Sequence, residues 1–79
     1  SGKISFLLKY FDPDGAPQSV SLFYDDSEYA MNLDVGIASK GLYRVDVDLV
    51  AYPSSYYFSV VDSSGTEWRY PDTGKFETQ

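Results

Sequence analysis

Apolar and polar residues alternate along most of this chain, and this alternation limits the fold more than any other feature of the sequence. In residues 43–49 every odd position is apolar and every even position is charged. Successive side chains of a β-strand point to opposite faces of its sheet, so the pattern predicts a strand with one face in the core and the other in water. Further alternating stretches predict strands at 3–10, 19–24, 28–34 and 66–70, and helical spacing is absent.

Turn-forming residues separate these stretches at intervals of about 8 to 12 residues. Residues 11–17 hold two prolines, a glycine and two aspartates, while Asp25-Asp26-Ser27 and Ser63-Ser64-Gly65 predict hairpin tips. Glycines interrupt the apolar residues of 35–41, which predicts a loop with at most a short strand. Residues 56–62 are aromatic and β-branched on both faces, as in a central strand. The whole pattern predicts an all-β, small antiparallel immunoglobulin-like β-sandwich of six to seven strands, with a small five-stranded barrel as the alternative.

The chain has 79 residues and no cysteine, which allows one domain over residues 3–79. We interpret Ser1-Gly2 as a cloning remnant. Because no disulfide can contribute, stability has to come from large buried side chains, and aromatic residues make up 18% of the sequence. We expect Trp68 to be the anchor between the two sheets. The other aromatic residues expected in the core are Phe6, Tyr24, Tyr43 and Phe58.

Charge and composition exclude several classes of function. The net charge of -6 argues against nucleic-acid binding, which needs basic patches. No apolar run is long enough to insert in a membrane. Histidine and cysteine are both absent, which removes the usual zinc ligands and most nucleophile–base pairs. Asp46 and Asp48 form a carboxylate pair about 6.5 to 7 Å apart on one strand face, but we expect that face in water, so we predict no enzyme activity and no cofactor.

A possible calcium site lies in the first turn, where Asp12 and Asp14 place two carboxylates close together. Carboxylate oxygens are the ligands that calcium prefers. The turn supplies only these two, however, and lacks the spaced ligands and distal glutamate of an EF-hand loop. The alternative is that both aspartates form Asx-turns, in which the side chain accepts a backbone N–H.

A second group of candidates consists of aromatic residues that could contact a ligand. Exposed rings of Tyr52, Tyr57, Trp68 and Tyr70 would suit stacking on sugar faces. Alternation places Tyr57 outside if its neighbours Tyr56 and Phe58 face the core, so Tyr57 is a better candidate than Trp68. The sequence thus predicts Tyr57, Tyr52 and Trp68 as the residues that contact a ligand.

The order of these turns and aromatics resembles immunoglobulin-like modules of bacterial and archaeal secreted or cell-surface multidomain proteins. The resemblance begins with an aromatic residue followed by Asp-Pro-Asp-Gly and a proline, within residues 10–17. It departs from the family at Ala16, where an acidic residue is common, and at Asp25-Asp26-Ser27, where Asp-Gly is frequent. The other matching pieces are Tyr29-x-Met31, Gly41-x-Tyr43, Tyr56-Tyr57-Phe58, Asp62, Gly65, Pro71 and Gly74.

The resemblance implies a secreted or cell-surface location and a non-catalytic spacer or adhesion-type module excised from a larger protein. Its partners would be neighbouring domains of the parent chain, or protein or polysaccharide at the cell surface. Two alternatives remain open: a carbohydrate-binding module that serves a polysaccharide-active enzyme, and a calcium-stiffened adhesion repeat. A spacer should have its two ends at opposite poles, whereas a sugar-binding module should expose several coplanar rings.

Overall fold

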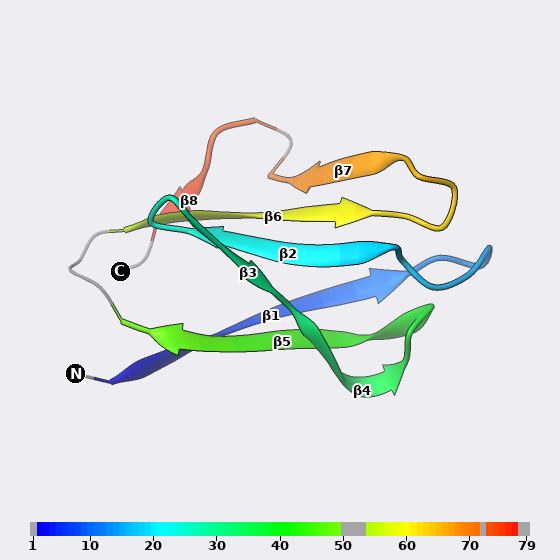
Figure 1. Cartoon of the computed structure of the whole chain (residues 1–79), viewed down its shortest axis with the longest axis horizontal. Coiled ribbons are helices and arrows are strands. Elements are labelled where there is room, and N and C mark those ends of the chain that lie inside the picture. Colours follow the sequence, from blue (N-terminus) through cyan, green and yellow to red (C-terminus); the bar gives the residue numbers. More distant parts are fainter. Residues whose placement is uncertain (1, 50–53, 72, 78–79) are drawn as a thin grey trace.

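The computed structural model describes residues 2–49, 54–71 and 73–77, which form eight β-strands and no helix. The fold is the all-β antiparallel sandwich that the alternation predicts (Figure 1). No helix long and apolar enough to cross a membrane occurs among these residues. The strands are β1 (Lys3–Phe11), β2 (Ser19–Tyr24), β3 (Ser27–Ala30), β4 (Asn32–Ile37), β5 (Lys40–Asp48), β6 (Ser55–Val61), β7 (Glu67–Tyr70) and β8 (Phe76–Glu77).

The strands form two sheets. One has the order β1-β5-β4, and the other has the order β3-β2-β6-β7, with β8 pairing β6 beside the end of β7. Within the described residues no strand pairing joins the two sheets, so the architecture is the sandwich rather than the five-stranded barrel. The pairings β1–β5 and β2–β6 place β1, β4 and β5 where an immunoglobulin-type sandwich has strands B, D and E, and β2, β6 and β7 where it has C, F and G.

The segment expected to be one return strand at 28–34 changes sheets in its middle. Residues up to Ala30 pair with β2, whereas residues from Asn32 onward pair with β5. At the crossing, the buried Met31 donates its backbone N–H to the carbonyl of Val20 at 2.8 Å. Figure 1 shows β3 running diagonally from the β2 sheet into β4. This split, together with the two-residue β8, raises the strand number from the predicted six or seven to eight.

The loop predicted for residues 35–41, with at most a short strand, shrinks to a turn at Ala38-Ser39, because β4 extends to Ile37 and β5 begins at Lys40. The glycines in this stretch permit a close approach of the two backbones. A Cβ atom on Gly41 would lie 2.6 Å from the carbonyl oxygens of both Val35 and Ile37. Gly36 has a φ of +91°, a conformation that side chains disfavour. Glycine therefore maintains this hairpin rather than ending the strands.

The predicted hairpin tip at residues 25–27 is confirmed as a two-residue turn. Asp25 and Asp26 both have positive φ values, 51° and 68°. Two consecutive positive φ values are typical of a type I′ turn, whose twist matches that of the paired strands. The turn places Tyr24 opposite Ser27 and so fixes the register of β2 and β3.

Large side chains from both sheets fill the core. Four of the five predicted core aromatics are buried, and the ring of Phe6 packs against Tyr24 and Tyr56 with centroid distances of 5.1 and 4.8 Å. The prediction for Trp68 is wrong, since 61% of this residue is exposed. The buried hydrophobic residues are Phe6, Val20, Leu22, Tyr24, Met31, Tyr43, Val47, Phe58 and Val60.

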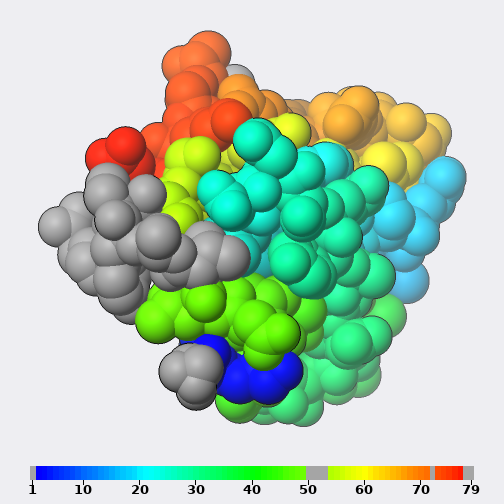
Figure 2. Space-filling view, turned by 60° about the vertical axis from the view of Figure 1, so that its left-hand side comes forward, coloured from blue at the N-terminus to red at the C-terminus, as the bar shows by residue number. Residues whose placement is uncertain are grey.

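Both ends of the described chain lie at one pole of the sandwich. The N–H of Leu49 donates to the carbonyl of Gly2 at 3.0 Å, and Glu77 pairs with Ser55, so both ends flank the connection between β5 and β6. Figure 2 turns this pole toward the viewer, with the blue start of β1 at the bottom and the red C-terminal residues at the upper left. An end-to-end spacer is expected to have its ends at opposite poles, and this arrangement differs from it.

Candidate binding groove

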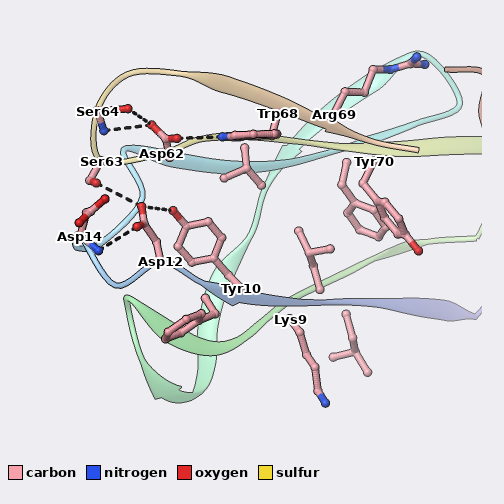
Figure 3. A pocket seen from close by; sticks show the side chains of 15 residues that line it. Lys9, Tyr10, Asp12, Asp14, Asp62, Ser63, Ser64, Trp68, Arg69 and Tyr70 are labelled. Carbon is pink, nitrogen blue, oxygen red and sulfur yellow. Dashed lines mark hydrogen bonds between the residues drawn. The ribbon is translucent and has the colours of Figure 1, made fainter. Parts of the chain in front are cut away.

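A groove of about 810 Å³ opens between β1 and β7, the last strands of the two sheets on the same side of the sandwich. Consecutive residues of each strand line it, so strand edges as well as side chains form its walls (Figure 3). Phe58 and Val60 of β6 contribute from the core side. The wall residues are 7–12 and 14 on one side and 62–64 and 68–70 on the other.

Trp68 and Tyr70 are the large side chains of the β7 wall. Trp68 lies opposite Val60 and Tyr70 lies opposite Phe58, and paired residues of an antiparallel sheet share a face. Since Val60 and Phe58 are buried in the core, Trp68 and Tyr70 also point toward the space between the sheets. They are nevertheless 61% and 58% exposed, because in the described chain the facing sheet ends at β1. Trp68 therefore points inward as expected, but no strand of the described residues covers it.

The carboxylate of Asp62 fixes the Trp68 ring. The indole N–H of Trp68 donates to Oδ2 of Asp62 at 2.8 Å. The other oxygen of Asp62 accepts the hydroxyl and backbone N–H of Ser64 and the backbone N–H of Thr66. These donors stabilise the charged carboxylate, with the indole contributing most, and they lower the pKa of Asp62 to about 2. Asp62 thus ties the β6–β7 hairpin and orients the ring in the groove.

Asp12 has a similar role at the end of the β1 wall. Its Oδ1 accepts the backbone N–H of Asp14 at 2.9 Å, and its Oδ2 accepts the hydroxyls of Tyr10 and Ser63. The Asp14 N–H is the main cause of a lowered pKa for Asp12. Burial, followed by the hydrogen bond to Asp12, raises the pKa of Tyr10 to about 12. Asp12 therefore forms the Asx-turn that was the alternative to a calcium site.

The calcium candidates Asp12 and Asp14 stand together at one end of the groove (Figure 3). In the part of the chain that the structure describes, no group of three or more carboxylates is close enough to hold a metal ion. Asp62 is held by the donors of its own hairpin on the opposite wall. The hydrogen bonds that Asp12 and Asp62 accept from the protein indicate a structural role for both carboxylates.

The basic side chains near the groove point away from it. The guanidinium of Arg69 lies 4.1 Å from the centroid of the Tyr57 ring and donates to the carbonyl of Gly74 at 2.6 Å. Figure 3 shows the side chains of Lys9 and Arg69 directed away from the groove on opposite sides. The charged groups that face the groove are therefore carboxylates, and they gather at the Phe11 end of β1.

Tyr57 and Trp68, the two described candidates for ligand contact, are not brought together. Tyr57 lies on the outer face of its sheet, stacked on Phe23 with a centroid distance of 4.8 Å and covered by Arg69. It lines a separate hollow of about 300 Å³. Tyr52 lies outside the described residues. Of the two candidates that the structure describes, Trp68 lies in the groove and Tyr57 does not. Leu7 and Phe11, both exposed, are wall residues that the sequence analysis did not single out, because nothing in the sequence shows which strand ends the sheet.

The carboxylates Asp46 and Asp48 lie on the outer face of the three-stranded sheet, away from the groove. Asp46 accepts the hydroxyl of Ser5 at 2.6 Å and the guanidinium of Arg44 at 3.0 Å, while Asp48 pairs with Lys3. The Ser5 hydrogen bond is the main cause of a lowered pKa for Asp46. A general acid needs a raised pKa, so these contacts fit a charged outer face.

Comparison with known proteins finds no matching family model, curated protein or solved structure. The groove is therefore the feature of the described residues that bears on function. Its main features are two inward-pointing exposed aromatic rings, two strand edges and a carboxylate-rich end.

Proposed function

We propose that this chain is a non-catalytic interaction module of the adhesion type from a larger secreted or cell-surface protein, and that it binds another polypeptide in the groove between β1 and β7. One observation carries the proposal. Trp68 and Tyr70 point toward the interior of the sandwich, yet more than half of each is exposed. Aromatic anchors of this kind supply much of the affinity in protein interfaces.

The chemistry of the acidic groups supports a binding role without catalysis. The carboxylates of Asp12 and Asp62 accept hydrogen bonds within their own turns, and both have lowered pKa values. Each is therefore held as a charged acceptor and not as a proton donor near neutral pH. Their described contacts fix the two walls of the groove and leave the rings accessible.

The position of the chain ends favours adhesion over spacing. Both ends of the described chain lie beside the β5–β6 connection, while Asp12, Asp14 and Asp62 stand at the far end of β1. A module attached at one pole projects the opposite pole and its sides toward partners. The same attachment would not string copies end to end.

Carbohydrate binding is the second candidate, and the exposure of Trp68 and Tyr70 is the observation that favours it. The two residues are two positions apart in β7, so they are adjacent on one face of the strand, and both line the groove. Rings at this spacing suit stacking on successive sugar faces.

The emission of Trp68 tests both candidates, because Trp68 is the single tryptophan of the chain. We expect a blue shift when a library of extended synthetic peptides is added, and no change with soluble β-glucans, xylans, mannans or chitin oligomers. The variant Trp68→Phe gives the background in each titration. Saturable binding of a polysaccharide, measured by titration calorimetry and lost in Trp68→Ala and Tyr70→Ala, would replace the proposal by carbohydrate binding. If the Trp68 emission changes with neither the peptides nor the polysaccharides, both candidate functions are contradicted.

A further inference from the structure

We infer that the partner enters the groove as an extended strand that pairs antiparallel with the free edge of β1, with a basic residue near its own N-terminus. The inference rests on the proposed function and specifies how the polypeptide is bound. It follows from the direction of the β1 backbone groups, the length of the edge, the rings that face it and the charges at its end.

The backbone groups of every second residue of β1 point away from β5. The N–H of Asp12 donates to the carbonyl of Ser39, and that of Leu49 donates to the carbonyl of Gly2, at the two ends of one unbroken register. In an antiparallel pair, hydrogen-bonded and non-hydrogen-bonded residues alternate. The even positions of β1 therefore bond to β5, and positions 3, 5, 7, 9 and 11 direct N–H and C=O to the free edge. No described strand pairs with that edge.

β1 offers a better template than the other wall of the groove. It spans nine residues with no proline and no register shift against β5. β7 spans four residues, and the Asp62–Thr66 backbone bond shows by the same alternation that Glu67 and Arg69 alone point outward from it. Long exposed edges readily accept another strand, and natural proteins usually shorten, kink or cover them.

A strand added to β1 would also cover the exposed rings. It would extend the three-stranded sheet by one position, to where an immunoglobulin-type sandwich has strand A. Its inward side chains would face β7 across the usual sheet separation of about 10 Å. Trp68 and Tyr70 already point into that space, so apolar side chains at alternate positions of the partner would complete the core there.

The charges on the groove select the chemistry and direction of the partner. Asp12, Asp14 and Asp62 stand where β1 ends, whereas the side chains of Lys9 and Arg69 are turned away. A basic residue fits this end, and in an antiparallel pair the N-terminal part of the partner lies there. The net charge of -6 makes a second copy of this chain a poorer occupant, because like-charged molecules repel.

The probe is an acetylated ten-residue peptide in which valine and threonine alternate after two N-terminal arginines. Its reversed sequence has the same composition and charge and places the arginines at the wrong end for antiparallel pairing. We expect the first peptide to bind the intact protein at least about tenfold more tightly than the reversed peptide, as measured by Trp68 emission and by amide chemical shifts.

The substitution Leu7→Pro removes an N–H that points to the free edge and places a ring there, while the inward hydrogen bonds of β1 remain. We expect it to weaken peptide binding about tenfold or more. Leu7→Ala removes the side chain but keeps the N–H, so it should weaken binding much less than Leu7→Pro does. Glu67→Pro is the matched change on the β7 edge and should also retain binding.

Modified peptides make the test independent of how Leu7→Pro folds. N-methylation of one alternating set of peptide amides removes the donors that face β1, and methylation of the other set leaves them in place. Strand pairing predicts that one set abolishes binding and the other retains it. Equal effects of the two sets would overturn the inference.

Other outcomes separate the two levels of the proposal. Equal binding of both peptides that is insensitive to Leu7→Pro would overturn strand addition and leave a peptide-binding groove. Loss of binding in Glu67→Pro alone would move the pairing to β7 and overturn the assignment to β1. Dimerisation seen by sedimentation and removed by Leu7→Pro, without peptide binding, would make a second copy the occupant. Binding of polysaccharides but of neither peptide would overturn the proposed function as well.

Discussion

The indole N–H of Trp68 and the carboxylate of Asp62 form a 2.8 Å hydrogen bond across the β6–β7 hairpin. The bond holds an exposed aromatic ring in one orientation on the groove wall. It also contributes most to the low pKa of Asp62. The contact therefore links the shape of the candidate site to a property that can be titrated.

Replacing Trp68 with phenylalanine removes the main donor to Asp62, so we expect the pKa of Asp62 to rise from about 2 toward its ordinary value of 3.8. In the wild type the folded pKa lies below the unfolded one. The stabilising contribution is thus complete above the unfolded value and is lost as the pH falls through 3.8 toward 2. Carbon-detected NMR titration of the Asp62 carboxyl measures the pKa. Thermal unfolding between pH 5 and 2 should show that Trp68→Phe loses less stability on acidification than the wild type does. An unchanged pKa in this variant, with Tyr70→Phe as the control, contradicts the assignment.

The exposure of Trp68 predicts that it contributes little to the core. Trp68→Ala should lower the free energy of unfolding by about 1 kcal/mol or less, as expected of an exposed position. Leu22→Ala removes a fully buried side chain and should cost about 2 to 5 kcal/mol. Urea unfolding followed by circular dichroism measures both variants. A loss in Trp68→Ala as large as that in Leu22→Ala would restore the role of anchor between the sheets.

The β4–β5 hairpin depends on the absence of a side chain at Gly41. In Gly41→Ala the new Cβ would meet two carbonyl oxygens and Cδ1 of Leu33, each at 2.6 Å. We expect a loss of about 2 kcal/mol or more, since backbone cannot move away as a flexible side chain can. Gly2→Ala, which meets nothing within 4 Å, is the control. Equal stability of the two variants by chemical unfolding would show that the strands separate easily.

The hairpin between β2 and β3 should accept glycine with a gain in stability. Asp26 has a φ of 68°, which costs a non-glycine residue energy, and Asp-Gly is a preferred type I′ sequence. Asp26→Gly should raise the free energy of unfolding by about 0.5 to 1 kcal/mol. Asp26→Val places a β-branched side chain at the same φ and should destabilise the protein. The idea fails if both substitutions shift the urea midpoint in the same direction.

Local chemistry made much of the fold predictable. Alternation at 43–49 marked β5 correctly, because a half-buried strand needs one apolar and one polar face. The tip at Asp25-Asp26 was predictable since short polar side chains tolerate positive φ. The strands around Gly36 and Gly41 were missed because glycine breaks an apolar pattern in the same way at a turn and at a close strand contact.

The sequence by itself determined most strands and turns, most of the aromatic core and the charged outer face, since these depend on neighbours within a few residues. The direction of Trp68 was also predictable from its place in the alternation. Tertiary structure alone decided that Met31 marks a change of sheet and that β1 ends its sheet. Burial depends on what lies opposite, and opposite Trp68 and Tyr70 the described chain has no strand. The same rings that alternation assigns to the core thus form the wall of a groove.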